Sequence, residues 1–143
     1  MALEALESNK HDTYLTIAAI WALESHCERN KVGCIIVKDN MIVSDGYNGT
    51  PHGFNNKCEI IDLGITTTKE EVIHAEANAI CKLAKSTNTS IGSTIYITVA
   101  PCFECAKLII QSNIRLVIYK EDYRNNKGLQ LLREANIQYD KRQ

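Results

Sequence analysis

Two short segments of the chain carry residues that can do metal chemistry, the His-Ala-Glu of residues 74–76 and the Pro-Cys-Phe-Glu-Cys of residues 101–105. The imidazole of His74 and the thiolates of Cys102 and Cys105 are ligands that zinc prefers. Three protein ligands leave the fourth tetrahedral position open for water, which is typical of a catalytic rather than a structural zinc site. A carboxylate beside such a water can accept its proton, and so we expect Glu76 to act as a general acid and base and not as a ligand.

Both segments are expected at the start of a helix. Cys102 and Cys105 are three residues apart, so on a helix their side chains point to the same side. Pro101 suits a first helical turn, and the positive end of the helix dipole favours the thiolates that zinc needs. His74 and Glu76 would point about 200° apart on an ideal helix. We therefore expect His74 at the very start of its helix, where both side chains can face one cavity.

Neither segment is specific by itself. A Cys-x-x-Cys pair also occurs in redox sites and structural zinc sites, and a His-x-Glu triplet is common by chance. Together, each at an expected helix start, they favour a catalytic zinc over a structural zinc or a disulfide. The sequence thus predicts hydrolytic chemistry at an open zinc ion.

The hydrophobic pattern around these segments predicts alternating helices and strands. Strands are expected at 32–37, 41–47, 94–99, 116–119 and 137–139. Helices are expected from an N-cap at Asp12 to about residue 27, from a capping box at Thr68 and Glu71 to about residue 84, after Pro101, and at 129–135. Residues 48 to about 68 are expected to form a loop. This order predicts an α/β fold in which helices cover both faces of a mixed sheet.

The length and charge of the chain argue against several classes of protein. A chain of 143 residues is expected to form a single domain, residues 1–143. Its 16 basic and 17 acidic side chains give a net charge of −1, which argues against a polymeric nucleic acid as substrate. No apolar run is long enough to cross a bilayer, and Glu4 and Glu7 lie where a signal peptide would be basic or apolar. We expect a soluble, cytoplasmic protein with no membrane partner.

The chain has 6 cysteines, which raises the alternative of disulfides. With no export signal and a full set of core-forming residues, the chain is expected to keep its thiols reduced. Cys34 lies in an apolar strand and Cys81 in an apolar helix, so both are expected to be small, buried core residues. Neither a place in the core nor a place among the predicted zinc ligands explains Cys27 and Cys58.

Four segments of the sequence resemble deoxycytidylate (dCMP) deaminases of the cytidine deaminase superfamily. They are residues 32–37, 45–51, 74–80 and 101–110, and the Gly-Tyr-Asn-Gly-x-Pro element at 46–51 is the most discriminating of them. The resemblance implies a three-layer α-β-α cytidine deaminase-like fold with a mixed five-stranded sheet. It also implies hydrolysis of dCMP to dUMP and ammonia, a step that feeds thymidylate synthesis, with zinc as the cofactor. Zinc-bound hydroxide would attack C4 of the base while Glu76 shuttles protons.

The resemblance also implies roles for residues around the pocket. It implies substrate contacts from Asn48 to the sugar, from Tyr123 to the pyrimidine or the phosphate, and from Ala75. An asparagine before glycine can equally stabilise a turn, which is the alternative role of Asn48. Three cations can serve the 5′-phosphate, unless they are solvated surface residues: Arg29, Lys31 and Arg124.

Members of the family usually assemble as homo-oligomers, in particular hexamers, and many are activated by dCTP and inhibited by dTTP. The resemblance implies a regulatory nucleotide site at three residues: Gly46, Tyr47 and Gly49. Some relatives hold a second zinc ion through Cys and His residues. Four residues could form such a site here, although buried thiols and surface imidazoles are the alternative that we favour: Cys27, Cys58, His26 and His52.

Two other functions stay open as alternatives. Another zinc deaminase, acting on tRNA adenosine, a free base or a nucleoside, would share the zinc ligands, but the near-neutral charge and the element at 46–51 argue against it. A non-catalytic zinc-binding module would not need a carboxylate beside the metal, and the presence of Glu76 argues against that alternative.

Overall fold

The computed structural model describes the backbone of residues 2–143 and the side chains of residues 9–143. Its centre is a five-stranded sheet with the strand order β2-β1-β5-β6-β7. The strands are β1 (Gly33–Lys38), β2 (Met41–Tyr47), β5 (Thr94–Val99), β6 (Leu116–Glu121) and β7 (Gln138–Lys141). β1 is antiparallel to β2 and to β5, whereas β5, β6 and β7 run parallel to one another. The mixed five-stranded sheet that the sequence predicts is confirmed.

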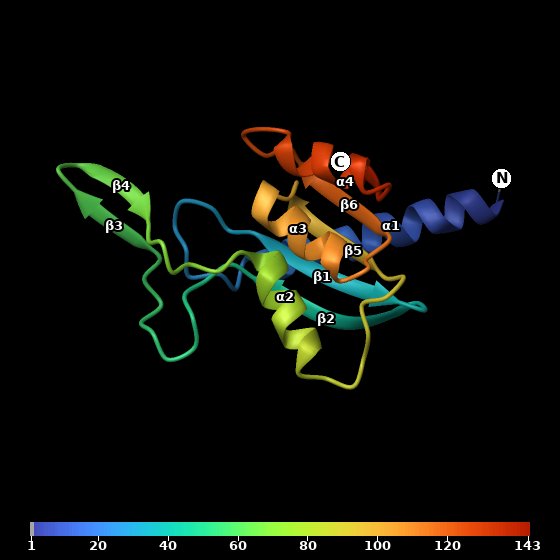
Figure 1. Cartoon of the computed structure of the whole chain (residues 1–143), viewed down its shortest axis with the longest axis horizontal. Helices are drawn as coiled ribbons and strands as arrows, with labels where there is room; N and C mark the ends of the chain where they lie inside the picture. The colour runs from blue at the N-terminus through green and yellow to red at the C-terminus, as the bar shows by residue number, and fades with distance from the viewer. Residues whose placement is uncertain (1) are drawn as a thin grey trace.

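Helices cover both faces of this sheet (Figure 1). The helix α1 (Ala2–Ala22) lies on one face, and α2 (Ala75–Ala84), α3 (Phe103–Gln111) and α4 (Lys127–Glu134) lie on the other. Successive side chains of a strand point to opposite faces, so Ile35 of β1 packs under α1 while Ile36 packs under the other three helices. This is the expected three-layer α-β-α fold.

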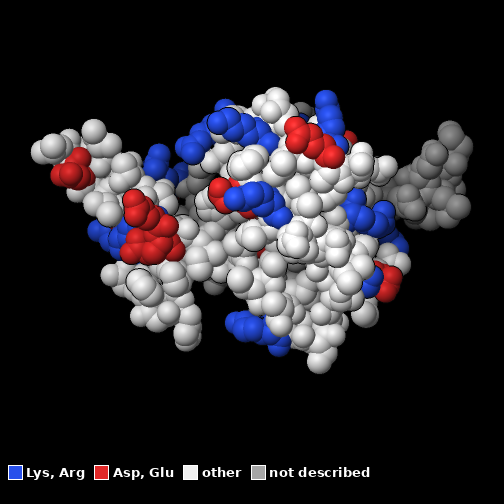
Figure 2. Space-filling model, viewed as in Figure 1, with Lys and Arg blue, Asp and Glu red and all other residues white. Residues whose placement is uncertain are grey.

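The surface carries charges of both signs. Figure 2 shows basic and acidic side chains interspersed over the face in view, with no continuous basic surface on that face. In the described part of the chain, no helix is both long enough and apolar enough to cross a bilayer.

The first helix starts earlier than the sequence predicts. It begins at Ala2 and ends at Ala22, so Asp12 lies in its interior and is not an N-cap. Strong helix formers such as Ala, Leu and Glu fill the segment before Asp12, which explains the early start. The helix stops before Cys27 because the N–H groups of residues 23–25 donate to carbonyls three residues back, in a tighter last turn.

The segment expected as a loop contains a second, two-stranded sheet formed by β3 (Glu59–Asp62) and β4 (Ile65–Thr68). It projects from the body of the molecule as a hairpin (Figure 1). Leu63 and Gly64 join the strands with positive φ angles of 51° and 76°, as a tight hairpin turn needs. Hydrophobic periodicity could not reveal these strands, because every residue in them except Glu59 is exposed.

The helix starts next to the two chemistry-bearing segments also differ in detail. β4 runs to residue 68, so the expected capping box at residues 68 and 71 is not formed. Instead α2 begins at Ala75 with His74 as its N-cap, and α3 begins after its N-cap, Cys102, which leaves Pro101 just outside the helix. Farther along, three elements are displaced by one to two residues from the predicted bounds: β6, α4 and β7.

The cysteines differ from the reduced set that the sequence predicts. Cys27 and Cys58 form a disulfide with their Cα atoms 5.1 Å apart, because the fold places the segment after α1 beside the start of β3. Cys34 is buried in the core, as predicted. Cys81 is exposed, contrary to prediction, because it lies two residues after the buried Ala79 and therefore on the outer side of α2.

Gly46 lets β2 approach the first turns of α2 closely. A Cβ atom there would lie 2.5 Å from the carbonyl oxygen of Ala75 and 2.7 Å from the amide nitrogen of Ala79. A Cβ atom on Gly49 would have nothing within 4 Å. We expect Gly46→Ala to lower the free energy of unfolding by about 1–3 kcal/mol through overpacking, and Gly49→Ala to change it by less than about 0.5 kcal/mol. Urea unfolding of the two variants measures this, and equal stabilities would contradict the close packing.

Candidate active site

His74 and Glu76 are placed by the start of α2. His74 is the N-cap with an extended backbone (φ −70°, ψ 157°), and Glu76 lies in the first helical turn. The preceding residue, Ile73, exchanges two backbone hydrogen bonds with Gly49, with N···O distances of 2.8 and 3.1 Å. This bridge fixes the direction in which the chain enters the helix. The placement predicted for His74 at the very start of its helix is confirmed.

Cys102 and Cys105 are placed by the start of α3. Cys102 is the N-cap, and the backbone N–H of Cys105, one turn later, donates to Sγ of Cys102 over 3.4 Å. Gly128, near the start of α4, lies against this turn, and a Cβ atom there would overlap the carbonyl oxygens of Pro101 and Cys102. Glycine thus allows α4 to support the segment that carries the thiols.

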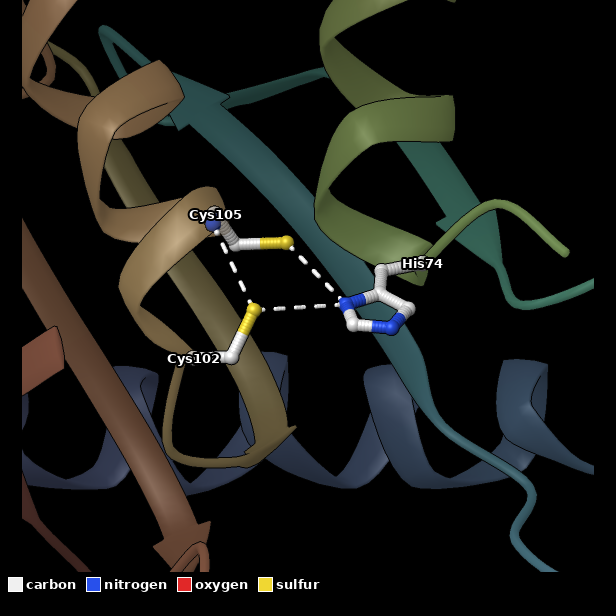
Figure 3. A group of neighbouring side chains, drawn as sticks. All are labelled: His74, Cys102 and Cys105. Atoms are coloured by element: carbon white, nitrogen blue, oxygen red, sulfur yellow. Dashed lines mark hydrogen bonds between the residues drawn. The ribbon is translucent and has the colours of Figure 1, made fainter. Parts of the chain in front are cut away.

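Three potential ligand atoms converge between the two helix starts (Figure 3). Nδ1 of His74 lies 3.4 Å from Sγ of Cys102 and 3.3 Å from Sγ of Cys105. Around a tetrahedral zinc ion with bonds of about 2.0–2.3 Å, ligand atoms are about 3.5 Å apart. The three side chains therefore fit a zinc ion with little movement of either helix. His74 and Cys102 border an open cavity while Cys105 is buried, which leaves room for a water on the cavity side.

Hydrogen bonds between the ligands separate their pKa values. The bond with Cys105 lowers the pKa of Cys102 to about 4, and a bond with His74 acts in the same direction. The same contact with Cys102, together with burial, raises the pKa of Cys105. The bond to Cys102 also raises the pKa of His74. The thiol of Cys102 therefore loses its proton more easily than that of Cys105, and because zinc binds thiolates, metal binding is coupled to proton release.

Glu76 is a carboxylate buried beside these ligands, with 4% of the residue exposed. Burial raises its pKa to about 7, although its backbone hydrogen bond, the charge of His74 and a hydrogen bond from Cys105 act in the opposite direction. A group with a pKa near neutrality both accepts and releases a proton easily at pH 7. The position and the pKa of Glu76 therefore suit a general acid and base.

A cavity of about 550 Å³ opens beside His74 and Glu76. Its lining includes five residues that the sequence relates to the substrate: Arg29, Asn48, Ala75, Tyr123 and Arg124. The guanidinium of Arg124 lies 5.2 Å from the centre of the Tyr123 ring, so the two side chains form one stacked unit. Lys31 lies outside this lining, and its ammonium donates to the carbonyl of Ser25 over 2.6 Å.

Asn48 has a structural role at the wall of this cavity. Its Oδ1 accepts from the N–H of Val32 over 2.9 Å, and its Nδ2 donates to the carbonyl of Asn30 over 2.8 Å. Its own carbonyl accepts from the hydroxyl of Ser25 over 2.8 Å. The side chain of Asn48 therefore links its segment to the one before β1 and does not stabilise its own turn, and the amide still has one N–H and one lone pair for a ligand.

The residues expected to hold a regulatory nucleotide are outside the cavity lining. Gly46 is buried under α2, and Gly49 bridges to Ile73 at the start of the same helix. Tyr47 is 37% exposed, with its ring 6.0 Å from that of Trp21 in α1. The regulatory role of Gly46, Tyr47 and Gly49 stays a prediction.

The residues considered for a second zinc ion come together only in part. The disulfide joins Cys27 and Cys58, and the carboxylate of Glu59 lies with them in a group whose ligand atoms are within 4.8 Å of one another. His26 and His52 are exposed and do not belong to this group. Among residues 9–143, the set of two cysteines and two histidines is thus not formed. The cysteines are buried and the imidazoles are exposed, as the alternative of buried thiols and surface imidazoles predicts. The prediction of free thiols is wrong, because the two cysteines form a disulfide.

The hairpin supplies a part of the cavity wall that the sequence does not predict. Glu59, Thr67 and Thr68 all line the cavity. The strand propensity of the threonines at residues 66–68 is the signal that could have found β4. Glu59 has no comparable signal, because its burial depends on contacts with a segment about thirty residues earlier.

Comparison with known proteins shows similarity over most of the chain. Residues 8–121 match the family model for the cytidine and deoxycytidylate deaminase zinc-binding region. The deoxycytidylate deaminase of Enterobacteria phage T4 is 34% identical, over 90% of this chain and 88% of its own length. The ComE operon protein 2 of Bacillus subtilis is 36% identical, over 92% of this chain and 69% of its own length.

Solved structures agree with this relationship. The dCMP deaminase from the cyanophage S-TIM5, in complex with dCMP and dUMP, superposes with a TM-score of 0.89 at 37% identity. The superposition covers 94% of this chain and 97% of that one. The residues matched to this zinc-binding region include His74, Cys102 and Cys105, whose geometry fits a zinc ion. The chain therefore belongs to the cytidine and deoxycytidylate deaminase family of zinc enzymes.

Proposed function

We propose that this chain catalyses the hydrolysis of dCMP to dUMP and ammonia. The observation that carries the proposal is the buried carboxylate of Glu76 beside a three-ligand zinc site, at a cavity large enough for a nucleotide. The choice of dCMP is supported by relatives named deoxycytidylate deaminase and by the similar structure that holds dCMP and dUMP. The product would feed thymidylate synthesis.

The chemistry divides between the metal ligands and Glu76. His74, Cys102 and Cys105 would hold the zinc ion, which would supply a Lewis acid that lowers the pKa of a water in the open coordination position. Glu76 is placed to accept a proton from that water, because its buried carboxylate lies beside the three ligands at the cavity. Glu76 would deliver this proton to N3 of the base, and would then pass a second proton, taken from the hydroxyl now on C4, to the leaving amine.

Two arginines suit the 5′-phosphate of the substrate. Arg29 and Arg124 line the cavity from segments far apart in the sequence. A guanidinium presents paired N–H donors that match phosphate oxygens, and it keeps its charge at every working pH. Arg124 is further held in place by its stacking on Tyr123. The phosphate therefore has two charged donors available within the same cavity as the zinc ligands.

The remaining substrate contacts stay predictions, supported by position. Asn48, Ala75 and Tyr123 all line the cavity. The unused N–H and lone pair of Asn48 suit a deoxyribose hydroxyl, which can both donate and accept. Tyr123 is half-buried and its ring can stack on a pyrimidine.

Assembly and regulation are the part of the proposal that rests on the family resemblance. A cytoplasmic homo-hexamer, activation by dCTP and inhibition by dTTP stay predictions, with Gly46, Tyr47 and Gly49 as the expected regulatory residues. β2 is an edge strand of the sheet, and Tyr47 at its end is partly exposed. A nucleotide or a second chain can therefore reach this part of the molecule.

Replacement of Glu76 by glutamine separates binding from turnover. Glu76→Gln keeps the shape of the side chain but cannot carry a proton, so we expect kcat for dCMP to fall by about 100-fold or more, with zinc content and dCMP affinity nearly unchanged. Ammonia release, metal analysis and calorimetric titration measure these quantities. Glu104→Gln is a matched control, because Glu104 is an exposed carboxylate in the first turn of α3. Undiminished turnover in Glu76→Gln would overturn the proposed mechanism.

The raised pKa of Glu76 also predicts a pH-dependent stability of the zinc-free protein. The folded-state pKa of about 7 lies above the ordinary value of 4.5, so folding favours the protonated form. This contribution is fully present below about pH 4.5 and is lost as the pH rises through 7. We expect zinc-free Glu76→Gln to be more stable than the zinc-free wild type at pH 8, by on the order of 3 kcal/mol, and equally stable at pH 4.5. Urea unfolding across this range measures the difference, and a constant difference would contradict the raised pKa.

The role of Arg124 in phosphate binding can be read from two substrates. We expect Arg124→Gln to raise KM for dCMP by about 10-fold or more, because a charged hydrogen bond is lost, and to leave kcat/KM for deoxycytidine unchanged. Steady-state ammonia release with both substrates measures this. Arg133→Gln is the control, because Arg133 also lies over a tyrosine ring, Tyr139, but does not line the cavity. Equal losses with dCMP and deoxycytidine would show that Arg124 does not bind phosphate.

A further inference from the structure

Glu59 is a buried acidic residue at the cavity wall that the mechanism does not use. It is 4% exposed, and its carboxylate accepts the backbone N–H of Glu28 over 3.1 Å and that of Arg29 over 3.3 Å. No lysine or arginine among residues 9–143 forms an ion pair with it. Backbone N–H groups therefore stabilise this buried charge, in the manner of an anion bound by a loop.

Arg29 is held a second time, through its side chain. Its Nη1 donates to Oγ1 of Thr68 over 3.3 Å. In the described part of the structure no carboxylate pairs with this guanidinium, so its positive charge is not neutralised by the protein. A cation held by a neutral hydroxyl at a cavity wall keeps its remaining donors for an anionic ligand.

The two groups that hold Arg29 come from one cross-strand pair. Glu59 of β3 lies directly opposite Thr68 of β4 in the register of the hairpin, so both side chains leave the same face of it. The disulfide between Cys27 and Cys58 joins the residue before Glu28 to the residue before Glu59. The base of the hairpin is thus fastened to the segment of Arg29 by a covalent bond, by backbone N–H groups and by a side-chain hydrogen bond.

We infer that Glu59 and Thr68 are positioning residues that orient Arg29 toward the 5′-phosphate, and so set the preference of the enzyme for a nucleoside monophosphate over a nucleoside. This inference rests on the proposed function. Glu59 fixes the backbone of Arg29, Thr68 fixes the direction of its guanidinium, and neither needs to touch the substrate. Their removal frees Arg29 to rotate into solvent, so the cost falls on phosphate binding and not on the proton transfers at Glu76.

The experiment measures ammonia release from dCMP and from deoxycytidine by the intact protein. For Thr68→Val we expect KM for dCMP to rise by about 3–10-fold with kcat within about twofold, the effect of one lost hydrogen bond. Thr68→Ser keeps the hydroxyl and should restore the wild-type KM. For Glu59→Gln we expect a larger rise, about 10-fold or more, because a charged acceptor is lost. Values of kcat/KM for deoxycytidine should not change in any of these variants.

A double-mutant cycle tests whether Thr68 acts through Arg29. If it does, Thr68→Val adds nothing to KM for dCMP once Arg29→Gln is present. Thr66→Val is the matched control, because Thr66 lies on the same strand, is exposed and does not line the cavity. Circular dichroism and thermal unfolding establish that each variant is folded, and Thr68→Val decides the matter if Glu59→Gln does not fold.

The outcomes separate the inference from the function on which it rests. A wild-type protein that deaminates deoxycytidine as well as dCMP would overturn the proposed function itself. A wild-type preference for dCMP that Thr68→Val and Glu59→Gln leave intact would overturn only the positioning role. Additive effects of Thr68→Val and Arg29→Gln, or equal losses with both substrates, would likewise count against positioning.

Discussion

The structure depends on one constraint, that two helices begin at the same place with a metal ligand at each start. His74 and Cys102 are both N-caps with extended backbones, so their side chains leave the helix axis and point across the gap toward each other. The sheet makes this meeting possible. β2 and β5 are each antiparallel to β1 and hence parallel to each other; α2 follows β2 after the hairpin of β3 and β4, and α3 follows β5 directly. Both helices therefore start at the same end of the sheet, where open α/β sheets bind their ligands.

The electrostatics of the site follow from this arrangement. Two helix N-termini direct free N–H groups and positive dipole ends toward one point, and hydrogen bonds with Cys105 and His74 lower the pKa of Cys102 there. The same end of the sheet is dry enough that burial raises the pKa of Glu76, although His74 lies nearby. The charged form is thus favoured for the thiol of Cys102 only. The contact with Cys102 and burial favour the neutral thiol of Cys105, and burial favours the neutral carboxyl group of Glu76.

The parts of the molecule that sequence predicts well are those specified by neighbours in the chain. Apolar runs at residues 32–37 and 94–99 predict the central strands, and the two-residue spacing of His74 and Glu76 predicts that the helix begins at His74. The pairing of Cys27 with Cys58 could not be predicted, because it is set by how α1 ends and by where an exposed hairpin returns to the body. Glu59 was missed for the same reason, since its partners are backbone N–H groups with no residue signature. Short sequence motifs therefore identify the reaction, whereas the part of the cavity wall that the hairpin supplies depends on tertiary contacts.

The hairpin is held in place at the cavity wall although every residue in its strands except Glu59 is exposed. An isolated two-stranded hairpin is marginally stable in water. Here every anchor lies at its base: the disulfide at Cys58, the N–H of Lys69 donating to the carbonyl of Cys58 over 2.7 Å, and the contacts of Glu59 and Thr68 with the segment of Arg29. The turn between β3 and β4 points away from the body of the molecule (Figure 1), and Leu63 in this turn is exposed. Because the base borders the cavity and the tip does not, changes along the hairpin can alter substrate preference while the two helix starts, and with them the chemistry, stay as they are.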